Sequence, residues 1–219
     1  MELKGGSMDN RIYQKTFLWL FVGLFVTFLC GYSLSVNTAL LESILRVGLI
    51  PIIVLEIGLA LIMGLLLNKL SATAIKICYL VYSAVTGITF SSIFIYYKMS
   101  SIISIFMVSS IIFLLLALYG YFTKKDVTTL GKILFMTLIG TIILSIINIF
   151  MGNSYVELVT SIVVLFVFMG YIIYDINRLK YLDNYIEEDK LAVYSAFQLY
   201  LDFINIFIRL LRFFGKRND

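Results

Sequence analysis

Apolar runs of about 20 residues follow one another along this chain, and they limit its possible folds more than any other feature. A helix of that length crosses the hydrocarbon core of a bilayer while pairing its own backbone groups. The composition agrees, with 61% hydrophobic residues, 14% charged residues and a mean hydropathy of +1.01. Soluble domains have about 45–50% apolar and about 25% charged residues. The sequence therefore predicts an all-α, polytopic membrane protein.

Seven membrane-spanning helices are expected, joined by short polar connections. The predicted spans are 17–36, 47–67, 74–96, 102–122, 133–150, 156–174 (continuing to about 182) and 191–214. The connection after the first span, NTALLES, is expected to be a loop, and the last connection is the acidic DNYIEEDK. Residues 1–7 look like an addition ahead of a native start at Met8. Residues 8–219 are predicted to form a single seven-helix transmembrane domain.

Lysine and arginine are distributed unevenly between the two sides of this topology. Eleven lie on the side of the amino-terminus: Lys4, Arg11, Lys15, Lys69, Lys76, Lys124, Lys125, Lys132, Arg178, Lys180 and Lys190. The opposite loops hold only Arg46 and Lys98. Because cytoplasmic loops carry an excess of positive charge, the amino-terminus is predicted to be cytoplasmic. The last helix is expected to cross fully, although a re-entrant helix would return the carboxyl-terminus to the same side.

The last apolar run carries a stripe of polar residues. They recur at alternating spacings of three and four: Ser195, Gln198, Asp202, Asn205, Arg209 and Arg212. These spacings place them on one face of a helix. An ionised carboxylate in hydrocarbon costs at least about 3 kcal/mol. We therefore expect this face to meet protein or water, and the last helix to be enclosed by the other six.

Two aspartates of the last two spans are expected at one depth. Asp175 and Asp202 are equidistant from the middle of the acidic connection, so an antiparallel helix pair brings them level. Two carboxylates held close together, away from bulk water, cannot both ionise freely, and the pair shares a proton over some pH range. Once deprotonated, the pair offers hard oxygen ligands for Ca²⁺. The structural alternative is that Arg178 neutralises Asp175 and Arg209 neutralises Asp202.

Other polar residues in the spans support or complicate this interpretation. Gln198 and Asn205 flank Asp202 on its stripe, where they could hydrogen-bond it or hold water. Glu56 in the second span could pair, be protonated or line a water-filled cavity. Histidine is absent, so any titration near neutrality falls to carboxylates. No basic run interleaved with aromatic residues suggests nucleic-acid binding, and Cys30 and Cys78 are expected to pack without forming a disulfide.

Four stretches of the chain resemble the Bax inhibitor-1 family, also called the transmembrane Bax inhibitor motif family. They are TGITFSSIFIYY (86–97), YGYFTKKDVTTLGKIL (119–134), IIYDINRLK (172–180) and LYLDFINIFIRLLRFFG (199–215). The resemblance implies a seven-helix fold with the last helix enclosed by six others. It also implies a pair of membrane aspartates, matching Asp175 and Asp202, and a pH-dependent calcium leak. We expect a bacterial member, located in the plasma membrane.

Three other functions compete with a leak channel. An intramembrane aspartyl protease also places a YD pair on its sixth span, which Tyr174 and Asp175 match. However, Asp202 lies in LYLDF rather than in a GxGD loop, and Pro51, the sole proline, lies outside any PAL element. No enzymatic activity is therefore expected. A proton-coupled calcium exchanger and a non-conducting membrane scaffold remain alternatives.

Overall fold

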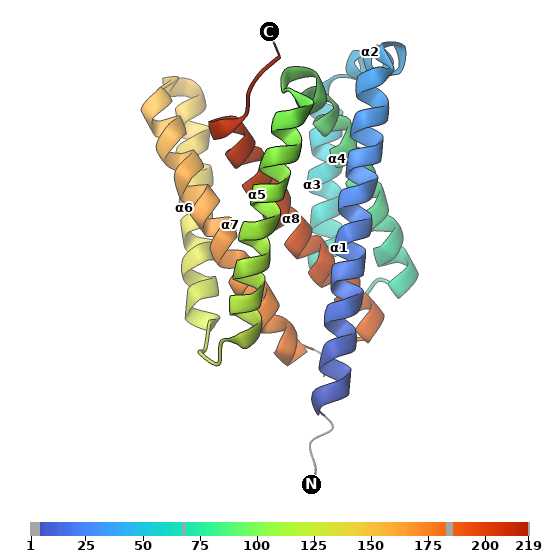
Figure 1. Cartoon of the computed structure of the whole chain (residues 1–219), viewed down its shortest axis with the longest axis vertical. Helices are drawn as coiled ribbons and strands as arrows, with labels where there is room; N and C mark the ends of the chain where they lie inside the picture. The colour runs from blue at the N-terminus through green and yellow to red at the C-terminus, as the bar shows by residue number, and fades with distance from the viewer. Residues whose placement is uncertain (1–4, 68, 183–185, 219) are drawn as a thin grey trace. The chain divides into compact units, whose positions relative to one another are not determined.

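The computed structural model describes residues 5–67, 69–182 and 186–218, and its main elements are α-helices (Figure 1). Their bounds are α1 (Gly5–Val36), α2 (Thr38–Val47), α3 (Leu49–Leu65), α4 (Ala72–Tyr96), α5 (Met99–Phe122), α6 (Thr128–Met151), α7 (Ser154–Leu182) and α8 (Glu188–Phe214). Residues 1–4 of the expected amino-terminal addition and residues 183–185 of the acidic connection lie outside the described part. Among the described residues no strand of a sheet is found, so the all-α prediction is confirmed.

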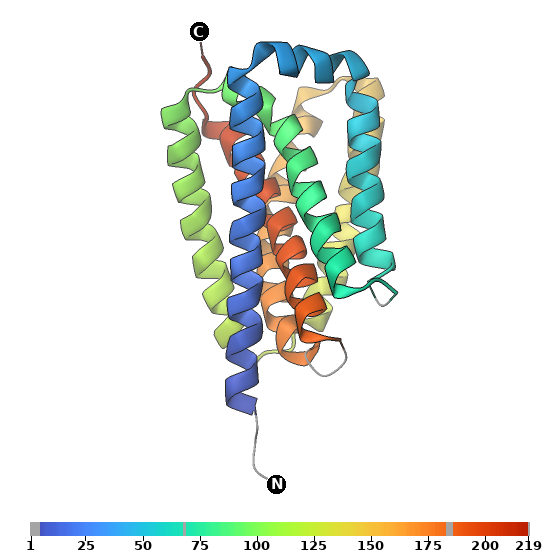
Figure 2. The ribbon, with the colours of Figure 1, turned by 90° about the vertical axis from the view of Figure 1, so that its right-hand side faces the viewer.

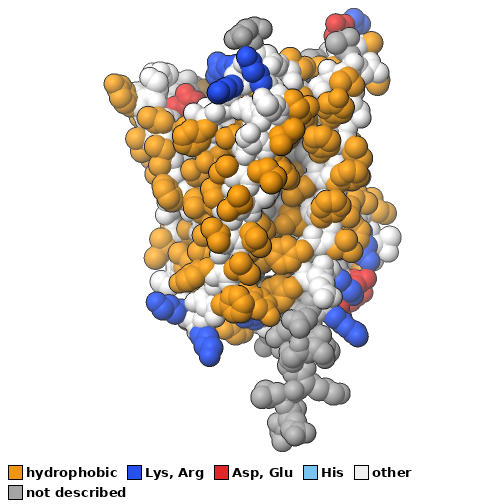
Figure 3. All heavy atoms as spheres, in the orientation of Figure 1, with side chains coloured by type: hydrophobic (Ala, Val, Ile, Leu, Met, Phe, Trp, Pro, Cys, Tyr) orange, Lys and Arg blue, Asp and Glu red, His pale blue; other side chains and the backbone are white. Residues whose placement is uncertain are grey.

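Six of these helices are long and apolar enough to cross a membrane: α1, α4, α5, α6, α7 and α8. The second predicted span, 47–67, forms the shorter helix α3 of 17 residues. At 1.5 Å per residue α3 is about 26 Å long, slightly less than the hydrocarbon core of about 30 Å. A seventh spanning helix therefore stays a prediction. In Figure 3 hydrophobic side chains cover the visible helices along their lengths, with Lys and Arg gathered near helix ends.

The prediction of a loop after the first span is wrong. The segment NTALLES instead opens α2, and the side chain of Asn37 caps it by accepting a hydrogen bond from the Leu40 amide at 3.2 Å. Asparagine at this position satisfies an amide that the first turn leaves unpaired. Figure 2 shows α2 crossing from the end of α1 to the start of α3. Leu41 is buried on one side of α2 while Leu40 is exposed, which makes α2 an amphipathic helix.

The helices group into two compact units. The first comprises Met1–Ser100, Leu182–Tyr200 and Lys216–Asp219, and the second comprises Ser101–Tyr181 and Leu201–Gly215. Helix α8 thus contributes its first half to the first unit and its second half to the second. A single domain over residues 8–219 stays a prediction.

The first unit is organised around close packing of α1 on α4. A Cβ atom added at Gly87 would lie 2.6 Å from the Cβ of Cys30 and 2.9 Å from the carbonyl oxygen of Thr27, so only glycine permits this approach. The Thr27 hydroxyl lies 2.9 Å from the Ser83 carbonyl oxygen and 2.6 Å from the Tyr200 hydroxyl of α8. The face of α4 that carries Ser83 and Gly87 therefore packs against α1.

Ion pairs at one end of the first unit join the start of α8 to its neighbouring helices. Asp189, at the start of α8, accepts hydrogen bonds from Lys15 at 2.7 Å and from Lys76 at 2.9 Å. These two contacts hold the start of α8 to both α1 and α4. Elsewhere in this unit the carboxyl-terminal tail pairs with the connection between α4 and α5, where Tyr97 and Arg217 form an antiparallel bridge.

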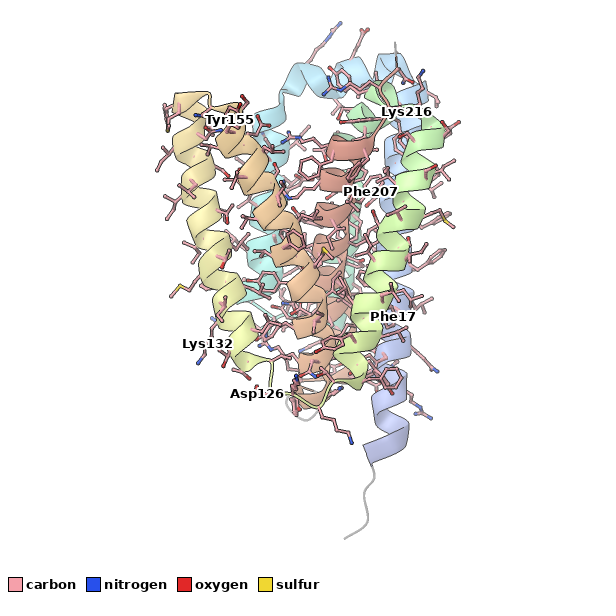
Figure 4. All side chains as sticks on the ribbon, turned by 60° about the vertical axis from the view of Figure 1, so that its left-hand side comes forward. Phe17, Asp126, Lys132, Tyr155, Phe207 and Lys216 are labelled. Carbon is pink, nitrogen blue, oxygen red and sulfur yellow. The ribbon has the colours of Figure 1, made fainter. Side chains whose placement is uncertain are left out.

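The second unit packs α7 against α5 and α6, and the second half of α8 against α5. The ring of Phe203 meets Phe106 and Phe113 edge-on, with centroids 5.3 Å and 5.8 Å away. Phe207, labelled in Figure 4, lies one turn further along α8 and also meets Phe106. Gly131 of α6 admits the ring of Tyr174, since an added Cβ atom would clash with that ring.

Helix α8 is the most buried of the candidate spans. In its most apolar stretch 72% of the residues are buried, whereas no other candidate span exceeds 39%. A buried helix can carry polar groups that a lipid-facing helix cannot. This burial agrees with the expected position of the last helix, while its enclosure by six others stays a prediction.

Candidate functional site

The two aspartates predicted to lie level are neighbours in the second unit. Asp175 of α7 is 8% exposed and Asp202 of α8 is 4% exposed. Their carboxyl groups lie within hydrogen-bonding reach of each other. Carboxylates only accept hydrogen bonds, so a hydrogen bond between these two groups requires one of them to carry a proton. Two carboxyl groups in this position can share one proton.

The pair is not fully satisfied by hydrogen bonds. The Oδ2 atom of Asp202 is shielded from solvent and has no hydrogen-bond partner within the described chain. A buried polar atom without a partner is costly, and such atoms in native proteins commonly belong to functional sites. This oxygen is therefore available to a proton, a water molecule or a cation.

Aromatic and basic side chains of α7 surround the pair. Tyr171, one turn before Asp175, interacts electrostatically with both carboxyl groups. Arg178, one turn after Asp175, acts on that carboxyl group through its positive charge, and its guanidinium lies 5.9 Å from the centre of the Tyr174 ring. Among the described residues no ion pair joins Arg178 to Asp175, so neutralisation of Asp175 by Arg178 stays a prediction.

Helix α7 is held next to α5 immediately beyond Asp175. The amide of Asn177 donates hydrogen bonds to the carbonyl oxygens of Gly120 and Thr123, each at 3.2 Å. The ammonium group of Lys180 approaches the same two oxygens at 3.4 Å and 3.2 Å. These are carbonyls at the end of α5 that its own helix leaves unpaired. They fix the part of α7 that presents Asp175.

The remaining residues of the α8 stripe do not pair with Asp202. Asn205 donates its amide to the Leu201 carbonyl oxygen of its own helix at 2.8 Å, and Gln198 is half-buried one turn before Asp202. Among the described residues no ion pair joins Arg209 to Asp202, so Arg209 does not neutralise it. Arg209 instead lines a cavity at the end of α8.

Glu56 belongs to a polar cluster within the first unit. Its carboxyl group lies near the side chain of Thr86, whose buried hydroxyl has no hydrogen-bond partner among the described residues, and the hydroxyls of Tyr82 and Tyr200 are its electrostatic neighbours. Sequence reasoning identified Glu56 but not these companions. Hydroxyl-bearing residues are frequent in helix–helix contacts, and their spacing alone does not reveal which carboxylate they meet.

The aspartate pair supplies only part of a metal-binding site. Within the described residues no group of three or more His, Cys, Asp or Glu side chains could hold a metal ion. Calcium takes about six to eight oxygen ligands, so water and backbone carbonyl oxygens would have to complete its shell. The two carboxyl groups alone do not make up a complete calcium shell.

Comparison with known proteins identifies the family. The sequence model described as "Inhibitor of apoptosis-promoting Bax1" matches residues 9–219. The chain belongs to the Bax inhibitor family. This match includes both aspartates and all of helices α2 to α8, so the resemblance expected from four stretches extends over almost the whole chain.

Several curated relatives of this Bax inhibitor family chain are bacterial proteins. The inner membrane protein YbhL of Escherichia coli strain K12 is 36% identical over 207 residues, which cover 91% of this chain and 88% of that protein. An uncharacterized protein of Borreliella burgdorferi is 34% identical, covering 97% and 94%. An uncharacterized membrane protein of Streptococcus pyogenes serotype M1 is 33% identical, covering 95% and 92%. Together with the six candidate spans, these matches establish a multi-pass integral membrane protein.

Proposed function

We propose that the protein is a calcium leak channel whose conductance depends on pH through Asp175 and Asp202. One observation carries this proposal: two buried carboxyl groups lie within hydrogen-bonding reach of each other inside candidate membrane spans. An ionisable residue within a membrane is functional by default, because its burial is costly. In this proposal the chain conducts ions and catalyses no reaction.

The shared proton acts as the gate. While one carboxyl group is protonated, the two side chains attract each other and hold α7 against the second half of α8. Loss of that proton leaves two adjacent negative charges, which repel each other in a poorly screened interior. The side chains then separate, and their oxygens become ligands for a calcium ion. The unpartnered Oδ2 atom of Asp202 supports this step, because it already lacks a protein donor.

The proposed setting is the plasma membrane of a bacterium, with the amino-terminus in the cytoplasm. The inner-membrane relative from Escherichia coli supports the compartment. The excess of Lys and Arg on the amino-terminal side supports the orientation. Calcium and protons are then the transported and sensed ions, and the bilayer is the only other partner proposed.

Calcium flux into proteoliposomes tests the proposal. Flux through the wild type should change between acidic and alkaline pH, and Asp202→Asn should flatten that response because the amide cannot lose a proton. Asp126→Asn makes the same chemical change on an exposed residue between α5 and α6, and should leave the response intact. Indistinguishable pH profiles for all three proteins would contradict the proposal.

The same liposomes separate the alternative functions. A leak conducts calcium down its own gradient without any pH difference across the membrane. In a proton-coupled exchanger, calcium flux is driven by the pH difference across the membrane. The direction of the flux reverses when that pH difference is reversed. A non-conducting scaffold gives no flux above that of empty liposomes.

A further inference from the structure

A cavity of about 400 Å³ lies within the second unit, where the end of α6 and the start of α7 meet the last turns of α8. Figure 4 labels Tyr155 near this end of α7, and Lys132 toward the opposite end of α6. The residues that define its chemistry are Ser145, Asn148, Glu157, Thr160, Ser161, Arg209 and Arg212. The aspartate pair is not among its lining residues, so the cavity calls for a separate explanation.

The charges lining this cavity do not cancel. Arg212 is neutralised by Glu157, with 3.0 Å between the guanidinium Nη1 and the carboxylate Oε1 atoms. Arg209 has no hydrogen bond or ion pair within the described chain, and its Nε atom is buried without a partner. The cavity therefore retains one uncompensated positive charge. Such a charge in a partly desolvated place calls for an anion.

Several hydrogen-bond donors of this cavity have no acceptor among the described residues. The Oδ1 atom of Asn148 accepts a hydrogen bond from the backbone amide of Asn153 at 3.1 Å. The side-chain NH₂ group of Asn148 has no acceptor among the described residues. The hydroxyl of Ser161, a residue 4% exposed, has no hydrogen bond to any described residue. Thr160 differs, since its hydroxyl donates to the carbonyl oxygen of Val156 at 2.7 Å. Three donor groups from three helices thus lack acceptors.

The backbone amides in the first turn of α7 do not add to these unpaired donors. The Asn153 side chain already accepts hydrogen bonds from the backbone amides of Tyr155 at 2.9 Å and Val156 at 3.3 Å. Asn153 also accepts the Glu157 amide through its backbone carbonyl at 3.1 Å. The helix start is capped, and the side chains of Asn148, Ser161 and Arg209 carry the site.

We propose that this cavity binds a phosphate group, with Arg209 as its main ligand and with Asn148 and Ser161 as further donors. A phosphate presents several acceptor oxygens at once, and the planar guanidinium fork matches two of them. The cavity lies where three candidate spans end or begin, close to Tyr155, which is 80% exposed. Tyrosine is enriched where a membrane meets water, the depth of lipid phosphates. The phosphate comes either from an anionic lipid headgroup or from free phosphate in solution.

Binding to the purified full-length protein in detergent tests this site. Native mass spectrometry with phosphatidylglycerol, and with phosphatidylcholine as its zwitterionic counterpart, probes the lipid source. Calorimetric titration with inorganic phosphate probes the free anion. Arg209→Gln should weaken the binding of the effective probe at least about tenfold, because a charge-assisted hydrogen bond is lost. Lys132→Gln removes the same charge from the far end of α6 and should change nothing.

A milder variant guards against loss of folding. Ser161→Ala removes one donor with little change in volume and should weaken binding by a few fold. Binding of phosphatidylglycerol that depends on Arg209 supports the site with a lipid source, and binding of inorganic phosphate that depends on Arg209 supports it with a free source. The proposal is overturned if neither probe binds the wild type, or if Arg209→Gln, folded as judged by its thermal unfolding, binds as the wild type does.

Discussion

Replacing Gly120 with alanine should destabilise the contact that holds α7 in place beside the aspartate pair. An added Cβ atom would lie 2.7 Å from the carbonyl oxygen and 3.1 Å from the Cα atom of Ile173. Both are backbone atoms of α7, which cannot rotate away as a side chain can. The clash would push α5 and α7 apart and stretch the hydrogen bonds from Asn177 to the carbonyl oxygens of Gly120 and Thr123.

Gly140 provides the matched control, because a Cβ atom added there meets no atom within 4 Å. Both glycines lie inside helices of the second unit, so alanine gains the same helix propensity of up to about 1 kcal/mol at each. The difference between the two variants therefore isolates the clash. Forcing a methyl group into a packed contact costs about 1–3 kcal/mol. For a chain of this size that corresponds to a difference in Tm of roughly 2–12 °C.

Thermal unfolding in detergent, followed through the helical circular dichroism signal, measures this difference. Gly120→Ala should unfold at a lower temperature than Gly140→Ala, which should match or exceed the wild type. Equal unfolding temperatures for the two variants would refute the reasoning, because they would mean that α5 and α7 do not pack at the observed distance.

Three further predictions concern the two aspartates, the topology and one loop. Asp202→Asn should flatten the pH response of calcium flux, whereas Asp175→Asn should weaken calcium binding and keep part of the pH response, since Asp175 lies within one turn of the positive Arg178 and nearer the acidic connection. Identical flux profiles would show that the two carboxyl groups act as one symmetric unit. In a background without native cysteines, a cysteine at exposed position 128 should react only from the cytoplasmic side and one at position 154 only from outside. Labelling of position 128 from outside would show that the predicted orientation is reversed. Labelling of both positions from the same side would show that the predicted span between them does not cross the membrane. Hydrogen bonds from the side chain and backbone of Thr128 hold the pKa of Asp126, which is outside the spans, below its usual 3.8. The stabilisation from this bond is present above the unfolded pKa and is lost as pH falls through the folded value. Carboxyl NMR titration should show this lowered pKa, and Thr128→Val should raise it; an unchanged midpoint would contradict the assigned contact.

The sequence alone determined the class of the protein and most of its helices. Hydropathy is a local property, so the ends of α4 and α5 were predicted to within a few residues. The depth of Asp175 and Asp202 also follows from local facts, because equal distances from one turn bring residues of two antiparallel helices level. Helix α2 was not predicted, because a segment of ten residues is too short to stand out as an apolar span, although the sequence does contain its amphipathic pattern.

Tertiary structure decided which polar groups meet. Spacing placed Arg209 and Asp202 on one stripe, yet the rotation of α8 and the packing of α6 and α7 give Arg209 a cavity of its own. The companions of Glu56 likewise depend on how α3, α4 and α8 pack within the first unit. Contacts between helices depend on their rotation and axial shift, and a single sequence carries no local signal for either. For this reason the acid pair could be expected from the sequence, whereas the phosphate cavity emerged only from the packed helices.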